Sequence, residues 1–271
     1  MTPECRHDPM KVRIAHLYPQ AMDLYGDGGN VVALQRRCEW RGIEVEVVDV
    51  SVSQPADLSD VDLIVMGGGQ DTAQAFVAED LRRRGSALRD LIDGGAAALA
   101  VCGAFQLFGT GYTTARGQTL DGIGVFDAHT VSGANRFIGN VTVEVRLQRF
   151  GAAHAQAPLA VVGFENHSGL TYLGPKAAPL GRVLNGAGNL GDGTSEGAVY
   201  KNAIGTYLHG PLLPKNPRLA DHLIHAALCH RYGTVGPLAA LDDVLELDAH
   251  RVALMRCETG RVATARPRLA S

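Results

Sequence analysis

The chain has 271 residues, enough for one large α/β domain or two small ones. A hydrophobic content of 46% and a charged content of 20% are typical of a globular protein with a sizeable core. The net charge of -3 argues against nucleic acid as the main partner, and no apolar run is long enough to span a bilayer. Five cysteines without a CxxC pair, and no apolar secretory segment at the start, favour the cytoplasm and argue against a structural zinc site.

The first part of the chain predicts strands that alternate with helices. Residues 1–10 are polar and are expected to form a disordered leader, with Met10 as a candidate start of the fold. Strands are expected at residues 12–18, 43–50, 61–66 and 96–101. Helices are expected at residues 30–42 and 72–91, the second broken near Gly85. This alternation predicts an α/β fold with a central, mostly parallel sheet flanked by helices.

From residue 112 the pattern becomes β-rich, with no linker before it. Further strands are expected at residues 120–126, 137–147 and 159–165, an exposed loop at 185–193, and a hairpin at 198–200 and 203–208. An amphipathic helix is expected at 217–232 and a shorter one at 248–257. The sequence therefore predicts one domain over residues 11–240, with an additional β-rich portion, and a tail over 241–271.

Cys102 is the first candidate functional residue. The small and apolar residues 96–101 predict a strand buried on both faces, and Gly103 follows Cys102 ahead of a short amphipathic segment. The cysteine is thus expected on a sharp strand-to-helix turn, the geometry of a nucleophile elbow, where the helix N-terminus favours a thiolate. The alternative is that Cys102 is a small buried hydrophobic residue, as most free cysteines are.

His209 ends the predicted strand before Gly210 and Pro211. Because the carboxyl ends of parallel strands meet at one edge of a sheet, His209 and Cys102 are expected to form a Cys–His pair. In that pair the imidazole takes the thiol proton and later protonates a leaving amine. The alternative is a surface residue, since the chain contains ten histidines.

Glycines at strand ends are candidate substrate-binding residues. The run 67–69 follows a predicted strand, so the backbone N–H groups of Gly68 and Gly69 are candidates for stabilising an oxyanion, and Gly103 lies beside the cysteine. A phosphate-binding loop is excluded because no Lys-Ser/Thr pair follows the glycines.

Arg136 is a candidate for binding a substrate carboxylate, because arginine grips carboxylates in a bidentate fork; an exposed surface arginine is the alternative. Residues 163–169 are rich in polar groups after a strand. Glu165, Asn166 or His167 can line a pocket, although a turn with internal caps would look similar.

Taken together, these motifs resemble class I glutamine amidotransferases, in the cobyric-acid-synthase-like branch. Residues 163–167 and 207–217 are similar to the glutaminase subunit (GatD) of the bacterial lipid II isoglutaminyl synthase. The resemblance covers residues 11–232 and implies that Cys102 attacks the side-chain amide of L-glutamine, forming a thioester and releasing ammonia. It also implies that Arg136 binds glutamine.

The resemblance further implies a partner in a cytoplasmic heterodimer. In the family, ammonia travels to a Mur-ligase-like catalytic subunit (MurT), which uses ATP and Mg to amidate the D-glutamate of the lipid-linked peptidoglycan stem peptide. This chain itself is then expected to hold no cofactor and no metal, and to bind no nucleic acid.

Two departures from the broader family pattern stand out. Ala100 and Ala104 replace glycines, and Pro211 stands where the usual triad has a glutamate. His209 therefore lacks a local acid, and the isolated chain is expected to be a poor glutaminase whose partner supplies or positions the acid. Asp23 and Asp27 are either loop-forming residues or pocket acids, and the sequence does not decide between these roles.

Two other functions remain open at this point. The same chemistry could serve a cobyrinate-like acceptor, or the fold could be a non-catalytic binding module. The presence of both Cys102 and His209 argues against the binding module.

Overall fold

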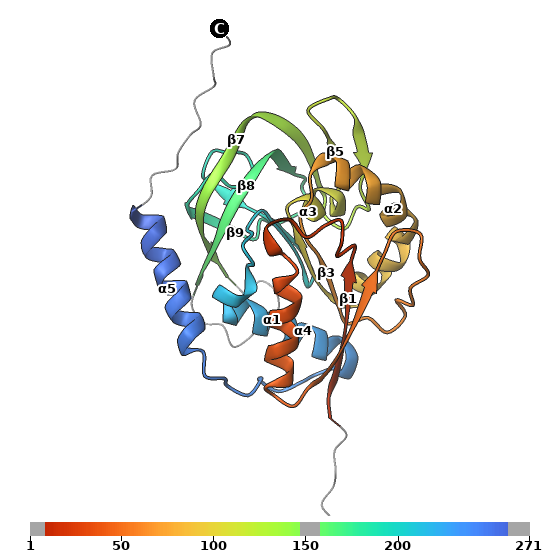
Figure 1. Cartoon of the computed structure of the whole chain (residues 1–271), viewed down its shortest axis with the longest axis vertical. Helices are drawn as coiled ribbons and strands as arrows, with labels where there is room; N and C mark the ends of the chain where they lie inside the picture. The colour runs from red at the N-terminus through yellow and green to blue at the C-terminus, as the bar shows by residue number, and fades with distance from the viewer. Residues whose placement is uncertain (1–8, 147–157, 260–271) are drawn as a thin grey trace, which may run out of the picture.

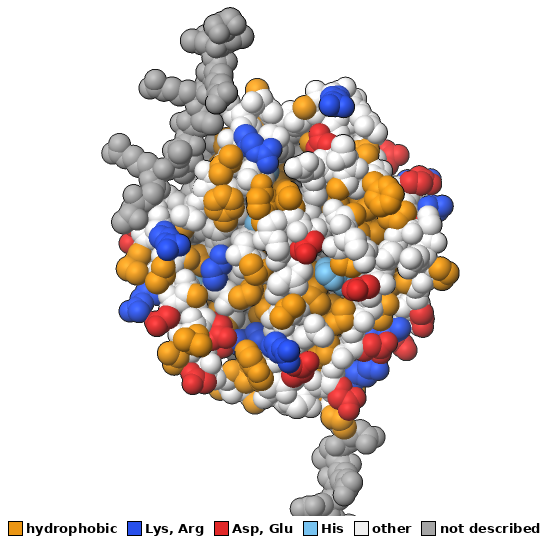
Figure 2. Space-filling view, in the orientation of Figure 1, with side chains coloured by type: hydrophobic (Ala, Val, Ile, Leu, Met, Phe, Trp, Pro, Cys, Tyr) orange, Lys and Arg blue, Asp and Glu red, His pale blue; other side chains and the backbone are white. Residues whose placement is uncertain are grey.

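The computed structural model describes residues 9–146 and 158–259 (Figure 1). The predicted leader at residues 1–10 lies almost wholly outside the described residues, and the first strand, β1, spans Lys11–Leu17. Among the described helices, none combines the length and apolar character needed to cross a membrane. On the face shown in Figure 2, lysines and arginines are interspersed with acidic residues and do not gather into a basic patch.

The first sheet has six strands. Across the sheet they are β11 (Ala198–Tyr200), β12 (Ala203–Thr206), β4 (Ala97–Val101), β3 (Leu63–Met66), β1 and β2 (Glu44–Val50). All neighbours are parallel except β11, which pairs antiparallel with β12. Every residue of β3, β4 and β12 is buried, as their uninterrupted runs of small and apolar residues predict for central strands covered on both faces.

Helices cover this sheet. They are α1 (Gly29–Glu39), α2 (Asp71–Asp93), α3 (Gly103–Phe108) and α4 (Pro217–Tyr232). Helix α1 packs against α4, and α2 packs against α3. Helix α2 continues through Gly85, so the predicted break there is wrong. A side chain at this position would meet Ile123 at 3.0 Å, which shows that the glycine serves close packing and not helix termination.

The second sheet is dominated by a long antiparallel hairpin, β7 (Ala128–Val145) and β8 (Leu159–Leu173), which arches beside the first sheet in Figure 1. The remaining strands are β5 (Gly111–Thr113), β6 (Thr119–Asp121), β9 (Gly181–Asn185) and β10 (Ser195–Glu196). The predicted strand at 137–147 corresponds to the second half of β7, which ends at Val145, with residue 147 outside the described residues, and the predicted strand at 159–165 is the first part of β8. The polar residues 166–169 therefore continue a strand and do not form a turn, because cross-strand hydrogen bonds to β7 outweigh their turn propensity.

The segment after β9 also differs from its prediction. Residues 185–193 were expected to be an exposed loop, but Ala187 and Asn189 are buried. Asn189 exchanges side-chain hydrogen bonds of 2.9 and 2.8 Å with the backbone of Gly197, which draws the loop onto the sheet.

The last helix, α5 (Val244–Thr259), is longer than the predicted helix over 248–257 and is anchored by a buried arginine. The guanidinium of Arg37 on α1 binds Asp221 on α4 at 2.7 Å and Asp243, directly before α5, at 2.5 Å. Arg41 adds a bond of 2.8 Å to Asp221 and another of 2.7 Å to the carbonyl of Ala239. These bonds fix the segment that leads into α5.

We expect Arg37→Leu to lower the free energy of unfolding by about 2 kcal/mol, because two carboxylates lose the cation that they share. It should also expose residues 233–243 to limited proteolysis. Urea denaturation and peptide mapping measure both effects. Arg36→Leu is the matched control, because the side chain of Arg36 is 63% exposed and its ion pair is with the exposed Glu39. Equal stability of the two variants would contradict the anchoring role.

Candidate active site

Cys102 occupies the turn between β4 and α3. Its backbone has φ 51° and ψ -102°, a region that costs a non-glycine residue about 1–3 kcal/mol and is typical of a nucleophile elbow. The N–H of Cys102 donates to the carbonyl of Thr206 at 2.7 Å, which fixes the turn against β12. The side chain is 7% exposed and lines a pocket, so the thiol is held near the surface at the carboxyl edge of the sheet.

His209 follows β12 and is pinned by the second sheet. The backbone N–H of His209 donates to the carbonyl of Phe164 on β8 at 2.8 Å, and the backbone N–H of Phe164 donates to the carbonyl of His209 at 3.2 Å. The imidazole is fully buried. A methyl group added to Gly68 would lie 2.7 Å from Cε1 of His209 and 3.3 Å from Cβ of Cys102. The structure therefore brings Cys102 and His209 together on either side of Gly68.

The sequence offered no local acid for His209 and left the partner to supply or position one, but the structure places an acid of this chain beside His209. Oδ2 of Asp27, in the loop after β1, lies 3.0 Å from Nδ1 of His209 and accepts the N–H of Gly68 at 2.8 Å. Asp27 is 1% exposed. Pro211 packs against the same loop, since a methyl group on Gly29 would lie 2.7 Å from its Cγ. The usual acid position is thus filled by a packing residue, and the carboxylate comes from elsewhere.

The two loop aspartates that the sequence left undecided have different roles. Asp23 is exposed and accepts the N–H of Gly28, so it shapes the loop. Asp27 is buried behind the pocket, and its carboxylate contacts the ring of His209. No local sequence signal separates them, because the two carboxylates lie four residues apart in the same glycine-rich loop.

The charge state of His209 follows from its neighbours. Burial opposes a positive charge, but the Cys102 thiolate and the Asp27 carboxylate outweigh it and raise the pKa of His209 from 6.5 to about 10. Because Asp27 accepts a hydrogen bond from Nδ1, Nε2 is the ring nitrogen left to exchange a proton with Sγ of Cys102. In this arrangement a protonated His209 and a deprotonated Cys102 would stabilise each other.

The pocket beside Cys102 has a volume of about 420 Å³. Arg136 and Asn166 line it, and Nε of Arg136 donates to Oδ1 of Asn166 at 2.7 Å. The amide of Asn166 also donates to the hydroxyl of Tyr25, whose ring lies edge-on to His209 with centroids 5.1 Å apart. Arg136 is exposed, so its remaining N–H groups are at the mouth of the pocket.

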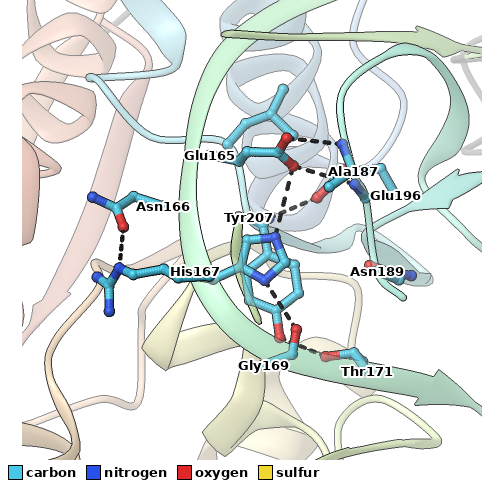
Figure 3. Close-up of polar contacts among 12 residues, drawn as sticks. Glu165, Asn166, His167, Gly169, Thr171, Ala187, Asn189, Glu196 and Tyr207 are labelled. Carbon is cyan, nitrogen blue, oxygen red and sulfur yellow. Dashed lines mark hydrogen bonds and ion pairs between the residues drawn. The ribbon is translucent and has the colours of Figure 1, made fainter. Parts of the chain in front are cut away.

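Side chains alternate along β8, and Figure 3 shows Asn166 on the opposite side of the strand from Glu165 and His167. The carboxylate of Glu165 accepts the N–H of Ala187 at 2.8 Å, so it holds the loop after β9 and does not line the pocket. His167 does line the pocket, and its ring stacks on Tyr207 with centroids 3.7 Å apart. Of the three candidates on this segment, Asn166 and His167 reach the pocket.

The three candidate glycines differ in whether their backbone N–H groups are free to bind an oxyanion. The N–H of Gly68 is already used by Asp27, which removes it as an oxyanion donor. Gly69 lines the pocket, and a methyl group on Gly103 would lie 3.0 Å from the backbone nitrogen of Gly69. The backbones of Gly69 and Gly103 are therefore neighbours beside the sulfur. No group of three or more potential metal ligands occurs among the residues that the structure describes.

An elbow cysteine, a buried histidine and an aspartate at the carboxyl edge of a parallel sheet define an α/β enzyme of the class I glutamine amidotransferase type. The chain belongs to the CobB/CobQ-like glutamine amidotransferase family, whose domain matches residues 13–217. This confirms the fold class and the family branch indicated by the sequence motifs.

Relatives of the chain include two that match it over nearly full length. It is 38% identical to the lipid II isoglutaminyl synthase (glutamine-hydrolyzing) subunit GatD of Streptococcus pneumoniae, over 88% of each chain. It is 36% identical to the subunit of that name from Staphylococcus aureus, over 91% of this chain and 96% of the relative. It is 29% identical to the cobyric acid synthase of Nocardia farcinica, but over only 44% of that protein.

Among solved structures, PurLQS from Thermotoga maritima superimposes with a TM-score of 0.54 at 14% identity, over 82% of this chain. At that identity the similarity shows the fold alone.

The raised pKa of His209 predicts how its charge and its contribution to stability depend on pH. A group whose pKa is higher in the folded state stabilises the fold below its unfolded pKa of 6.5, and this contribution is lost as pH rises through about 10. NMR titration of His209 should therefore show an imidazolium that persists above pH 8 in the wild type. In Cys102→Ala its pKa should fall toward 6.5. Titration near 6.5 in both proteins would contradict the coupling.

Proposed function

We propose that this chain is the glutaminase subunit of a two-chain lipid II isoglutaminyl synthase. The main support for the proposal is that Cys102, His209 and Asp27 lie next to one another, in that order, beside a pocket that Arg136 lines. The near full-length similarity to two subunits with this name supports it. The similarity to cobyric acid synthase supports a glutamine amidotransferase role in general, but the match covers less than half of that protein's length.

In the proposed reaction, the thiolate of Cys102 attacks the side-chain carbonyl carbon of L-glutamine. The carbonyl oxygen becomes an oxyanion that accepts the N–H groups of Gly69 and Gly103. The imidazolium of His209 gives its Nε2 proton to the nitrogen, the C–N bond breaks, and ammonia leaves a γ-glutamyl thioester. Water then attacks the thioester, Nε2 takes the water proton, and glutamate leaves as the thiolate is restored.

Two side chains position the reactants. Asp27 holds Nδ1 of His209, which leaves Nε2 for proton transfer and stabilises the imidazolium. Arg136 has one N–H engaged by Asn166, and we assign its other N–H groups to the carboxylate of glutamine. Because α3 has only six residues, we assign thiolate stabilisation mainly to His209 and not to the helix dipole.

The ammonia requires an acceptor enzyme. We propose a Mur-ligase-like partner (MurT) in the cytoplasm, which binds ATP and Mg and amidates the D-glutamate of the stem peptide. This chain needs no cofactor for the steps above, since each one is an acyl transfer or a proton transfer between its own side chains, substrate and water.

The test of this function is amidation of lipid II by the chain together with its candidate ligase, with glutamine as the nitrogen source. We expect amidated lipid II and equimolar glutamate from the wild type, and neither glutamine hydrolysis nor glutamine-dependent amidation from Cys102→Ser. Amidation of cobyrinate in place of lipid II would favour the alternative acceptor. Lack of glutamine hydrolysis by the wild-type complex would contradict the proposal.

Asp27→Asn should lower kcat for glutamine by about 10²-fold or more, because an amide cannot balance the imidazolium and allows the wrong tautomer. The effect on KM should be small, since Asp27 does not line the pocket. Ammonia release at several glutamine concentrations measures both constants. Asp23→Asn in the same loop is the control and should stay within about threefold of the wild type. Equal losses in the two variants would show that only the loop fold matters.

A further inference from the structure

Gln74 is a buried polar residue that the proposed chemistry does not use. It lies in the first turn of α2, is 3% exposed and lines the pocket with Cys102. Its Nε2 donates to the carbonyl of Gly69 at 3.1 Å. Its Cδ would lie 3.1 Å from a methyl group on Gly103. The amide of Gln74 therefore contacts both residues whose N–H groups are assigned to the oxyanion.

The peptide groups on the two sides of Gly69 are both held. The carbonyl of Gly68 accepts the N–H of Leu24 at 3.0 Å, and the carbonyl of Gly69 accepts Nε2 of Gln74. In a trans peptide the N–H points opposite to the carbonyl, so the bond from Leu24 directs the N–H of Gly69 away from Leu24. A glycine has wide φ/ψ freedom, and without the second bond only one side of Gly69 would be fixed.

The two ends of the Gln74 amide have different surroundings. Its Oε1 is buried and has no hydrogen-bond partner among the residues that the structure describes. The neighbour at Gly69 is a carbonyl, which only the NH₂ end of the amide can satisfy.

We propose that Gln74 is a positioning residue for the oxyanion site. By holding the carbonyl of Gly69, it fixes the dihedral angles of Gly69, and together with the bond from Leu24 to Gly68 it keeps the N–H of Gly69 aligned with that of Gly103 beside Cys102. This inference rests on the proposed glutaminase function, because the oxyanion it serves forms during attack on an amide or ester carbonyl.

The test compares Gln74→Met and Gln74→Glu with the wild type in the full chain with its ligase. Methionine removes the donor at similar volume, and glutamate places a carboxylate against the Gly69 carbonyl. We expect kcat for glutamine to fall about 10- to 100-fold in Gln74→Met and further in Gln74→Glu, with KM within about threefold. Gln54→Met is the matched control, because Gln54 is exposed and lies outside this pocket.

Alkylation of Cys102 by iodoacetamide separates positioning from general distortion. That reaction attacks a saturated carbon and forms no oxyanion, so its rate should be unchanged in Gln74→Met. Equal slowing of alkylation and of glutamine hydrolysis, or an unchanged kcat, would overturn the proposal.

Hydrolysis of p-nitrophenyl acetate keeps this test separate from the proposed function. The ester also forms an oxyanion at Cys102, so Gln74→Met should slow its hydrolysis relative to Gln54→Met. If the wild type hydrolyses the ester but not glutamine, the glutaminase proposal fails while the role of Gln74 is still measured. Equal esterase rates in the two variants would overturn the role of Gln74.

Discussion

The hydrogen bond between the Asp27 carboxylate and Nδ1 of His209 is the interaction on which the site depends. His209 is fully buried, and a buried imidazolium without counter-charges would be strongly unfavourable. A carboxylate on one side and a thiolate on the other allow the charge to persist. Asp27 is fixed in turn by the N–H of Gly68, so the loops after β1 and β3 and the end of β12 depend on one another.

The two sheets supply different parts of the site. The first sheet provides Cys102, His209, Asp27 and the glycine loop at its carboxyl edge, where open α/β sheets commonly place their sites. The β7–β8 hairpin supplies Arg136 and Asn166 at the mouth of the pocket. The backbone pairing of His209 with Phe164 joins the sheets at the reacting centre. A shift of the hairpin would therefore move the groups assigned to substrate binding and the histidine together.

The sequence predicted the features that depend on local pattern. An apolar run ending in Cys102 and Gly103 predicts an elbow, because a buried strand followed at once by a short amphipathic segment requires a sharp strand-to-helix turn at the cysteine. His209 was found in the same way, as a polar residue at a strand end. The family motifs around both residues then indicated the class of enzyme.

The features that the sequence did not predict are tertiary. Asp27 and His209 are 182 residues apart, and nothing near Asp27 distinguishes it from Asp23. Residues 166–169 look like a turn by composition, but pairing with β7 makes them a strand. Gln74 gave no signal, because its role depends on the carbonyl of Gly69, a backbone atom whose direction a sequence does not show.

We propose that Cys102 forms the covalent intermediate within an oxyanion site made by Gly69 and Gly103. The most direct measurement is a crystal structure of the complex after reaction with the glutamine analogue 6-diazo-5-oxo-norleucine. We expect one adduct, on Sγ of Cys102, with its carbonyl oxygen within hydrogen-bond distance of both glycine nitrogens and its carboxylate on Arg136. An adduct on another cysteine, or a carbonyl oxygen directed away from both glycines, would contradict it.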